Sequence, residues 1–261
     1  MGESKPLACV EELRVGEVSP HSDTVAIIVA GGVGERFGDP RGKQFVDLCG
    51  LPLMSWAILA FDRAPSVASI VLVCAPDRRA EVGSDVLSKL TLRCPVTIAS
   101  AGDTRQASVM SGLEAMPRGY ELVAVHDAAR PLIEVDDIER ACATVRADAS
   151  LAGAVCAARS IDTLKLVEGD TIVATPDRSL YWAAQTPQVF RTRALVSAYR
   201  AALHEGYQGT DDSSLVERHG GRVRVVETSR DNIKVTIPED LAIVEATLEQ
   251  RLVDSCGGET L

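Results

Sequence analysis

Short apolar runs alternate along the chain with segments whose apolar residues recur every three or four positions. The first run, 25–29, consists of Val, Ala and Ile without interruption, which is typical of a strand buried on both faces. Further strands are expected at 69–75, 96–99, 122–126, 153–158, 222–227 and 233–236. Their alternation with helical segments predicts the fold class α/β, as a doubly wound, mostly parallel sheet with helices on both faces.

Helix starts can be placed from capping residues and apolar stripes between these runs. Pro52 is expected to open the first helix, and Thr104 and Asp136 are expected to cap two more. A polar helix is expected at 77–90, and further helices are expected near 195–202, 210 and 238.

The alternation breaks at about 159–180, where two short strands, 163–167 and 171–174, flank the turn sequence Glu168-Gly169-Asp170. This pattern predicts a β-hairpin. The hairpin has little apolar surface to bury by itself, and an isolated two-stranded hairpin is marginal in water. We therefore expect an arm that packs on something else, for which a second subunit is one candidate.

Residues 24–252 are expected to form a single domain, with a flexible extension at 1–23 and a tail at 253–261. The extension is acidic and has no long apolar core, so it is typical of neither a signal peptide nor a basic transit peptide. No apolar run approaches the ~20 residues that a membrane span needs. These features predict a cytoplasmic protein without a membrane partner.

The formal net charge of −10 disfavours a nucleic-acid partner, because such a partner selects for a basic surface. It leaves a small phosphorylated substrate open, since local cations decide that binding. The 7 cysteines are scattered without a CxxC pair, which indicates thiols in a reducing compartment rather than a disulfide or zinc site.

The first strand runs directly into a glycine-rich loop, Ala30 to Gly38. Glycines let backbone N–H groups approach a phosphate chain with no Cβ in the way. Arg36 and Lys43 add two cations within reach of such an anion. The loop has no Gly-Lys-Ser/Thr ending, and Phe37 stands where a dinucleotide fingerprint requires glycine. The stretch therefore indicates a nucleotidyltransferase loop.

Asp127 follows the strand 122–126, at the carboxyl end where open α/β sheets bind ligands. A carboxylate that faces phosphate requires a divalent cation between them, and Mg²⁺ commonly binds one or two carboxylates plus substrate phosphates. Asp231 is the best second carboxylate, because it precedes the expected strand that holds Lys234. The alternative is that Asp127 caps a turn and Arg130 pairs with a surface acid.

Two further stretches are ambiguous by themselves. Gly102-Asp103-x-Arg105-x-x-Ser108 opens a helix whose N–H groups suit a sugar or phosphate, but it also fits an ordinary capped helix start. Asp162-Thr163 and Asp177-Arg178 bracket the hairpin and, in isolation, are more often turn residues or solvated charges than a site. His126 is expected to pack rather than catalyse, and no Ser/His/Asp or Cys/His set is evident.

Several motifs occur in one order over about 24–252. They are AGGVGERFG, GKQF, AGDTRQAS, VHDAARP, IDTLK, DRS with WAAQTPQVF, GTDDSS and RDNIKVTIPEDL. This set resembles the 2-C-methyl-D-erythritol 4-phosphate cytidylyltransferase family, which uses CTP in the non-mevalonate isoprenoid pathway. The resemblance implies a Rossmann-like nucleotidyltransferase fold, a sugar-alcohol phosphate acceptor, a Mg²⁺ cofactor and a homodimer whose arm is swapped between subunits.

The resemblance also implies roles for individual residues. The implied nucleotide site consists of Ala30, Gly31, Gly32, Gly34, Gly102, Asp103, Ser108 and Ala128. The implied acceptor site consists of Asp127, Arg130, Thr186 and Lys234, with Thr163 and Arg178 of the arm completing the site of the other subunit. Charge during transfer would be stabilised by Arg36, Lys43, Arg178 and Lys234, and the metal would be held by Asp127, for which Asp231 is the second ligand expected from its position. A phosphate acceptor is already anionic, so no general base is needed.

Departures from the family pattern keep a second acceptor open. The chain has Ala30-Gly31-Gly32 where the family usually has Ala-Ala-Gly, and this stretch is similar to the ribitol 5-phosphate cytidylyltransferase branch. Likewise, Gly42-Lys43-Gln44 replaces the usual Pro-Lys-Gln. The segment from His126 to Arg130 and the pair Thr210-Asp211 look more like the erythritol branch. A regulatory protein that binds CTP without turnover is a third possibility, which the cations and Asp127 disfavour.

Overall fold

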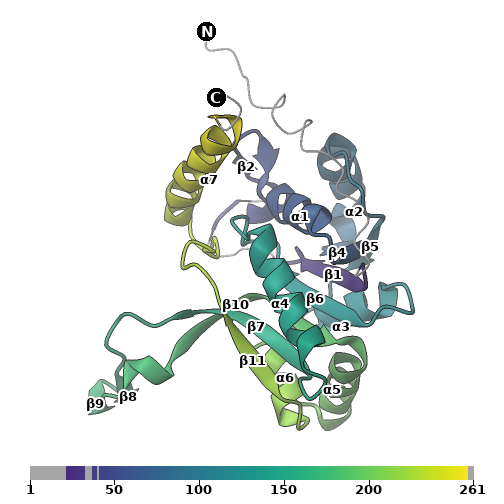
Figure 1. The fold of residues 1–261 in the computed structure, drawn as a ribbon. Helices are drawn as coiled ribbons and strands as arrows, with labels where there is room; N and C mark the ends of the chain where they lie inside the picture. The colour runs from purple at the N-terminus through teal and green to yellow at the C-terminus, as the bar shows by residue number, and fades with distance from the viewer. Residues whose placement is uncertain (1–21, 33–36, 40, 258–261) are drawn as a thin grey trace.

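A central sheet organises the protein (Figure 1), for which a computed structural model describes residues 22–32, 37–39 and 41–257. Its strands are β1 (Thr24–Val29), β4 (Val67–Cys74), β5 (Val96–Ser100), β6 (Leu122–Asp127), β7 (Gly153–Arg159), β10 (Trp182–Arg191) and β11 (Val223–Glu227). The sheet is seven-stranded, in the order β11-β7-β10-β6-β1-β4-β5. β10 runs antiparallel to both of its neighbours, and the other adjacent pairs are parallel. The predicted fold class is confirmed.

Helices cover both faces of this sheet. They are α1 (Leu53–Arg63), α2 (Arg79–Glu81), α3 (Arg105–Ala115), α4 (Val135–Ala147), α5 (Thr192–Glu205), α6 (Asp212–Arg218) and α7 (Glu239–Gly257). Short 3-10 or π segments occupy Lys43–Phe45, Pro76–Arg78, Val82–Val86, Leu87–Lys89 and Arg178–Leu180. Two small antiparallel pairs complete the fold, β2 (Asp47–Leu48) with β3 (Leu51–Pro52) and β8 (Leu166–Glu168) with β9 (Thr171–Ala174).

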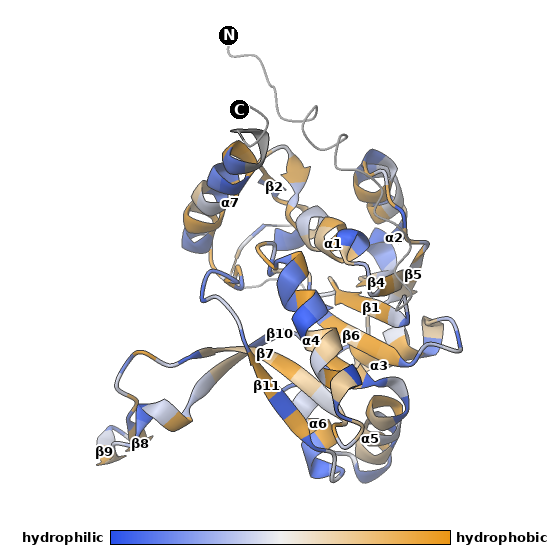
Figure 2. Ribbon diagram, viewed as in Figure 1, coloured by the Kyte–Doolittle hydropathy of each residue, from blue (hydrophilic) through white to orange (hydrophobic). Residues whose placement is uncertain are grey.

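Successive side chains of β1 point into two layers of the core. Ala26 and Ile28 pack in one layer with apolar residues of α1 and α4. Val25 and Ile27 pack in the other layer with residues of α3, α5 and α6. The ribbon coloured by hydropathy shows the same division, with apolar inner strands between helices of mixed character (Figure 2). A strand that is apolar on both faces requires helices on both faces, which is why the unbroken run predicted this arrangement.

A third apolar cluster joins α7 to the β2–β3 pair. Val244 and Leu248 of α7 pack there with Leu48, Leu51 and Trp56, and all of these side chains are buried. The docked helix fixes the end of the segment that precedes it, residues 232–238. That segment therefore reaches the edge of the sheet where β1 and β6 end, through the backbone hydrogen bond from Val235 N to Ala129 O at 2.8 Å.

The sequence pattern does not predict β10. Pro187 lies inside this strand, and a proline removes a donor from the ladder and argues against a strand. In the structure the pairing of β10 with β7 shifts between Ala184 and Gln188, so Pro187 falls where the ladder is interrupted. The rest of the strand keeps its pairing, and residues from Gln185 to Phe190 are buried between β6 and β7.

The polar helix expected at 77–90 is present as one uninterrupted helical stretch of mixed type. It runs through the 3-10 turn Pro76–Arg78, α2, the π segment Val82–Val86 and the 3-10 turn Leu87–Lys89. Val82 and Val86, four positions apart, are its fully buried side chains. The expectation for Thr104 is confirmed, because its side chain accepts a hydrogen bond from Ala107 N at 3.0 Å and caps α3.

Three boundaries differ from expectation. Asp136 is not a cap, because α4 already begins at Val135, which packs against the core. The strand expected at 233–236 has no assigned secondary structure, and it is joined to Ala129 by the bond described above. The first strand of the hairpin is limited to β8, where the pairing shifts after its first residue.

Candidate active site at the carboxyl edge of the sheet

The last residues of β1 and β6 lie side by side at one edge of the sheet. Val29 pairs in register with Asp127. From β1 the chain adds β4 and then β5 on one side, and it then returns to add β6 on the other side of β1. The strand order therefore reverses between β1 and β6. Ligands of open α/β sheets bind at such reversal points, outside the carboxyl ends of the strands. The glycine loop that follows β1 and Asp127 therefore share the expected binding edge.

Asp127 forms ion pairs with two cations, Arg105 and Lys234. Its Oδ1 accepts a hydrogen bond from Arg105 Nε at 3.0 Å, and its Oδ2 accepts one from Lys234 Nζ at 2.6 Å. The residue is 8% exposed. Burial by itself raises the pKa of Asp127, but the charges and hydrogen bonds of Arg105 and Lys234 outweigh it and hold the pKa well below its ordinary value. The carboxylate is therefore ionised at neutral pH, as a ligand for a hard cation must be.

Arg105 links Asp127 to a second, fully buried carboxylate. Its Nη1 and Nη2 donate to the two oxygens of Asp212 at 3.0 and 2.8 Å. Asp212 also accepts a hydrogen bond from the hydroxyl of Tyr199. The sequence motifs contain Arg105 and Asp212 without assigning them a role. One signal was available, because Arg105 is the first residue of α3, where the helix dipole disfavours a cation.

A chain of hydrogen bonds ties the backbone of Asp127 to Arg130. Asp127 N donates to Thr186 Oγ1 at 3.0 Å, and Thr186 Oγ1 lies 3.1 Å from His126 Nδ1. On the other side of the ring, Nε2 lies 3.2 Å from the carbonyl oxygen of Arg130. A carbonyl only accepts, so Nε2 carries the proton and Nδ1 accepts from the Thr186 hydroxyl.

His126 is a buried residue whose two ring nitrogens both have hydrogen-bond partners. It is fully buried, and burial lowers its pKa to about 4, so the ring is neutral. Both ring nitrogens are already used by Thr186 and Arg130, which confirms the expectation that His126 packs. Thr186 is brought to the site as expected, and its hydroxyl faces inward to Asp127 and His126.

Arg130 and Asn232 connect this edge with the segment before α7. Arg130 Nη1 donates to the carbonyl oxygen of Asn232 at 2.7 Å, while Asn232 Nδ2 donates to Thr186 O at 2.9 Å. The buried Nε of Arg130 has no hydrogen-bond partner within the described part of the chain. A surface ion pair, which was the alternative for Arg130, therefore does not describe its environment.

Lys43 reaches the same segment from the other side. Its Nζ donates to the carbonyl oxygen of Val235 at 2.6 Å, next to Lys234. The turn that carries Lys43 begins after Gly42, whose φ of 90° is a conformation that favours glycine. Lys43, Lys234 and Asp127 are thus gathered as expected. Arg36 and Gly34 lie outside the described residues.

Two tight backbone approaches shape the predicted nucleotide loops. A Cβ on Gly31 would lie 2.2 Å from Ala101 Cβ, and a Cβ on Gly102 would lie 2.6 Å from Ala107 Cβ. The buried Ser108 accepts a hydrogen bond from Gly102 N at 3.2 Å and donates to Thr104 O at 2.9 Å. Gly31, Gly102 and Ser108 therefore hold the loops after β1 and β5 together. Ala30 and Ala128 are buried beside them, whereas Gly32 and Asp103 are exposed.

Among the described residues, the arm and Asp231 take no part in these hydrogen bonds. The arm projects from the sheet, ending in β8 and β9 (Figure 1), and Thr163 and Arg178 on it are exposed. Among the described residues, Arg178 Nη1 contacts the carbonyl oxygen of Ile161 at 2.5 Å rather than the Asp127 edge. Asp231 is exposed, and its carboxylate accepts a hydrogen bond from Ser229 Oγ at 3.0 Å. Roles for these residues stay predictions.

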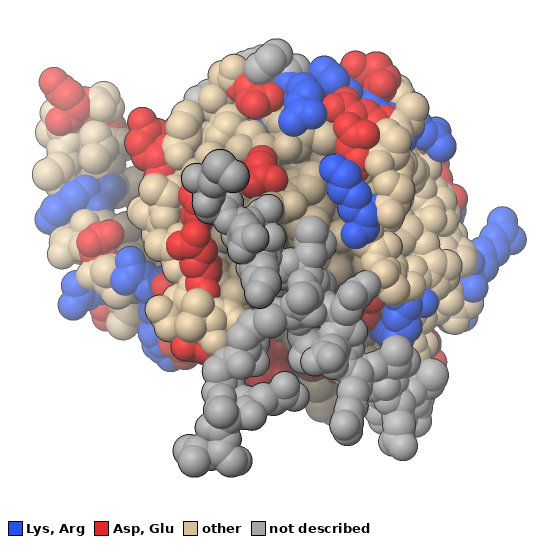
Figure 3. All heavy atoms as spheres, turned by 90° about the horizontal axis from the view of Figure 1, so that it is seen from above, with Lys and Arg blue, Asp and Glu red and all other residues tan. Residues whose placement is uncertain are grey.

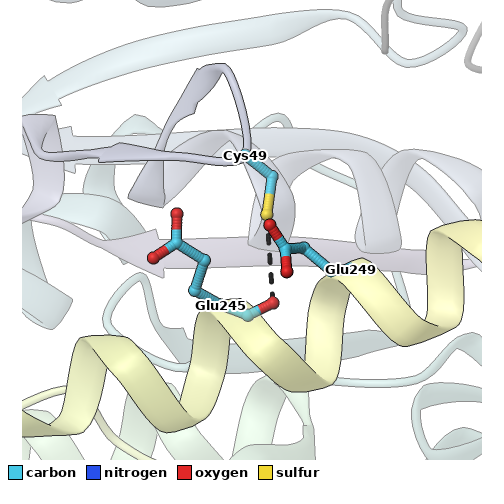
Figure 4. Close-up of side chains that lie close together, drawn as sticks. All are labelled: Cys49, Glu245 and Glu249. Atoms are coloured by element: carbon cyan, nitrogen blue, oxygen red, sulfur yellow. Dashed lines mark hydrogen bonds between the residues drawn. The ribbon is translucent and has the colours of Figure 1, made fainter. Parts of the chain in front are cut away.

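Another group of potential metal ligands lies on α7. Cys49, in the turn between β2 and β3, faces Glu245 and Glu249 of the helix (Figure 4), and their ligand atoms lie within 4.8 Å of one another. Burial and then the charges of the two glutamates raise the pKa of Cys49 to about 11. The thiol is therefore protonated at neutral pH, as expected of a residue packed between the turn and the helix.

Acidic and basic side chains are interspersed on the face seen from above (Figure 3), and the arm carries both signs. Within the described residues, the helices are too short or too polar to cross a membrane.

Comparison with known proteins places the chain among cytidylyltransferases. Residues 24–250 match the family model described as IspD: 2-C-methyl-D-erythritol 4-phosphate cytidylyltransferase. A protein of that name from Caldanaerobacter subterraneus is 38% identical over 226 residues, which cover 86% of this chain and 98% of the relative. One from Synechococcus elongatus is 40% identical over 226 residues, covering 86% and 96%.

Solved structures show the same similarity. The crystal structure of 4-diphosphocytidyl-2C-methyl-D-erythritol synthase from Anaerococcus prevotii has a TM-score of 0.76 and 27% identity, covering 87% of this chain and 96% of the other. The 2-C-methyl-D-erythritol 4-phosphate cytidylyltransferase from Thermus thermophilus has a TM-score of 0.69 and 29% identity, covering 87% and 99%.

Proposed function

We propose that this chain, which belongs to the 2-C-methyl-D-erythritol 4-phosphate cytidylyltransferase family, carries out its reaction at the edge formed by Asp127, Lys43 and Lys234. The reaction transfers the cytidylyl group of CTP to 2-C-methyl-D-erythritol 4-phosphate. It yields 4-CDP-2-C-methyl-D-erythritol and pyrophosphate for isoprenoid precursor synthesis. The observation that carries the proposed location is the ionised Asp127, held between Arg105 and Lys234 where the strand order reverses.

The chemistry requires charge stabilisation more than proton transfer. An oxygen of the acceptor's phosphate attacks the α-phosphorus of CTP, and the bond to the β,γ-pyrophosphate breaks. The acceptor oxygen is already anionic, so no base is needed, in keeping with the neutral, fully engaged His126. Lys43 and Lys234 are well placed to stabilise the charge that grows on the phosphate oxygens, and Arg36 would add to them.

Asp127 is the residue we propose to hold Mg²⁺, with Asp231 as a second ligand. Its carboxylate is ionised and lies at the edge of the sheet beside the glycine loop, and hard oxygen donors suit this ion. Bound Mg²⁺ would neutralise phosphate charge and polarise the α-phosphoryl group. A cation on Asp127 would compete with Arg105 and Lys234 for the two carboxylate oxygens.

A homodimer with exchanged arms would complete the acceptor site with Thr163 and Arg178. The arm supports this proposal because it exposes apolar side chains on an element with no core of its own. Ile161, Leu166, Ile172 and Leu180 are 50, 58, 57 and 77% exposed. Such a surface is costly in water and is typical of an element that packs on a partner.

Pyrophosphate release tests the function directly. The protein is assayed with CTP, UTP or ATP, with 2-C-methyl-D-erythritol 4-phosphate or ribitol 5-phosphate as acceptor, and with Mg²⁺ or a chelator. We expect release with CTP, Mg²⁺ and the erythritol acceptor, and little with the other pairs. A higher kcat/KM for ribitol 5-phosphate would assign the chain to the other branch, and CTP binding without any release would indicate a regulatory protein.

A further inference from the structure

Asp212 is a fully buried carboxylate outside the predicted site, and three hydrogen bonds hold it. Arg105 provides two of them at 3.0 and 2.8 Å, and the Tyr199 hydroxyl provides the third. Its side chain is 0% exposed. Removing a charge from water is expensive unless the charge is paired and hydrogen-bonded, so such a group is retained only where its partners are fixed.

The backbone that carries Asp212 is itself anchored to the central sheet. Asp212 is the first residue of α6, and the side chain of Asp211 before it caps the helix by accepting from Ser214 N. Gln188 of β10 then binds both sides of this turn, donating to Asp211 Oδ2 at 2.7 Å and accepting from Ser213 N at 3.0 Å. Two hydrogen bonds of the Gln188 side chain therefore hold the residues on either side of Asp212 to β10.

Asp212 determines which part of Arg105 faces Asp127. With Nη1 and Nη2 used by Asp212, the Nε–H remains for Asp127, at 3.0 Å. A guanidinium without Asp212 could turn its two-pronged side to Asp127 and bind both of its oxygens. Arg105 is thus shared between two carboxylates, and Asp127 is shared between two cations, Arg105 and Lys234.

We propose that Tyr199 and Asp212 are positioning residues, which orient Arg105 so that it binds Asp127 through Nε alone and leaves the carboxylate aligned for the reaction. Neither residue touches the substrate in this proposal. The inference rests on the proposed function, because the reaction must take place at Asp127. It goes beyond that function because it assigns the orientation of Arg105 against Asp127 to Tyr199 of α5 and Asp212 of α6.

A double-mutant cycle on kcat tests the proposal. Tyr199→Phe removes the hydroxyl and keeps the ring, and Arg105→Lys removes the bidentate contact with Asp212. We expect Tyr199→Phe alone to lower kcat by about 5- to 10-fold, because it removes a hydrogen bond to the charged Asp212 that orients Arg105. KM for CTP should stay within about twofold of wild type. In the Arg105→Lys background the same change should lower kcat by less than about twofold, because the guanidinium that links Asp212 to Asp127 is already absent.

Tyr207→Phe is the matched control. Tyr199 and Tyr207 both line a cavity of about 350 Å³ between α3 and α5. The ring of Tyr207, however, stacks on Arg218 at 4.2 Å and is not among the hydrogen-bond partners of Asp212. Its kcat should stay within about twofold of wild type, at a temperature where all variants are folded. A merely structural Tyr199 would lower kcat by the same factor in both backgrounds or not at all, and either result overturns the proposal.

A spectroscopic readout separates this proposal from the proposed function. The Nε–H signal of Arg105 can be assigned by its loss in Arg105→Lys, and it needs no turnover. Tyr199→Phe should shift this signal and speed its exchange with water, and Tyr207→Phe should not. If the wild type released no pyrophosphate, the proposed function would fail, while this measurement would still test whether Tyr199 and Asp212 orient Arg105. An unchanged Nε–H signal in Tyr199→Phe would overturn the positioning role alone.

Discussion

Lys234 and Asp127 are 107 positions apart in the sequence, yet Lys234 Nζ lies 2.6 Å from Asp127 Oδ2. The contact depends on the segment before α7, which is held to the sheet edge through Val235 and Ala129. Lys43 donates to the carbonyl oxygen of Val235, so two lysines from opposite ends of the chain meet on one segment. The segment before α7 therefore brings both lysines to the carboxyl edge of the sheet.

Lys43→Ala should lower turnover by ~10²-fold or more, a typical loss for one group that stabilises transition-state charge. The measurement is kcat for pyrophosphate release with saturating CTP and acceptor. Lys89→Ala is the matched control, because Lys89 is an exposed lysine on the polar 77–90 stretch, and its kcat should equal that of wild type. Near-wild-type turnover in Lys43→Ala would remove Lys43 from the mechanism.

Asp127 should contribute stability that depends on pH. Despite burial, Arg105 and Lys234 lower its pKa in the folded state, so the unfolded chain takes up a proton at a higher pH than the folded chain does. The contribution is therefore present above the ordinary Asp value of about 3.9 and is lost as the pH falls toward the lowered native value.

Urea unfolding of wild type and Asp127→Asn at pH 7, 5 and 3 measures the contribution of the Asp127 carboxylate to the free energy of unfolding. The free energy of unfolding should be higher for wild type at pH 7 and 5, and the difference should shrink at pH 3. A difference that stays constant over this range would mean that the carboxylate is not held ionised by its two cations.

Mixed dimers should show whether the arm serves the other subunit. Arg178→Ala alone should raise KM for the acceptor, and Lys43→Ala alone should be nearly inactive. With exchanged arms, a dimer of one subunit of each kind contains one intact site, so random mixing should restore about a quarter of the sites. If each arm serves its own subunit, no mixed dimer has an intact site, and no activity should return.

Gly31→Ala should destabilise the protein more than Gly32→Ala. A Cβ on Gly31 would lie 2.2 Å from Ala101 Cβ, which forces the loops after β1 and β5 apart, whereas a Cβ on Gly32 meets no described atom within 4 Å. We expect a lower thermal midpoint for Gly31→Ala and an unchanged one for Gly32→Ala. Equal midpoints would show that the loops adjust freely and that the close approach of Gly31 is not required.

Local patterns in the sequence determined the elements and where their ends meet. The unbroken apolar run at 25–29 requires cover on both faces, and the acid directly after 122–126 falls at the carboxyl edge because parallel strands share that edge. The glycines after β1 and the cap at Thr104 follow from the same short-range rules. These features depend on residues that are neighbours in the chain, so the sequence alone reveals them.

Only the tertiary structure decided how the site is held. β10 is inserted between β6 and β7 despite Pro187, and it brings Thr186 to Asp127 and Gln188 to the start of α6. Arg105 and Asp212 are likewise 107 positions apart, and neither helix start indicates that the two residues pair. Strand order and the pairing of buried charges arise from contacts between distant segments, and no periodicity along the chain encodes them.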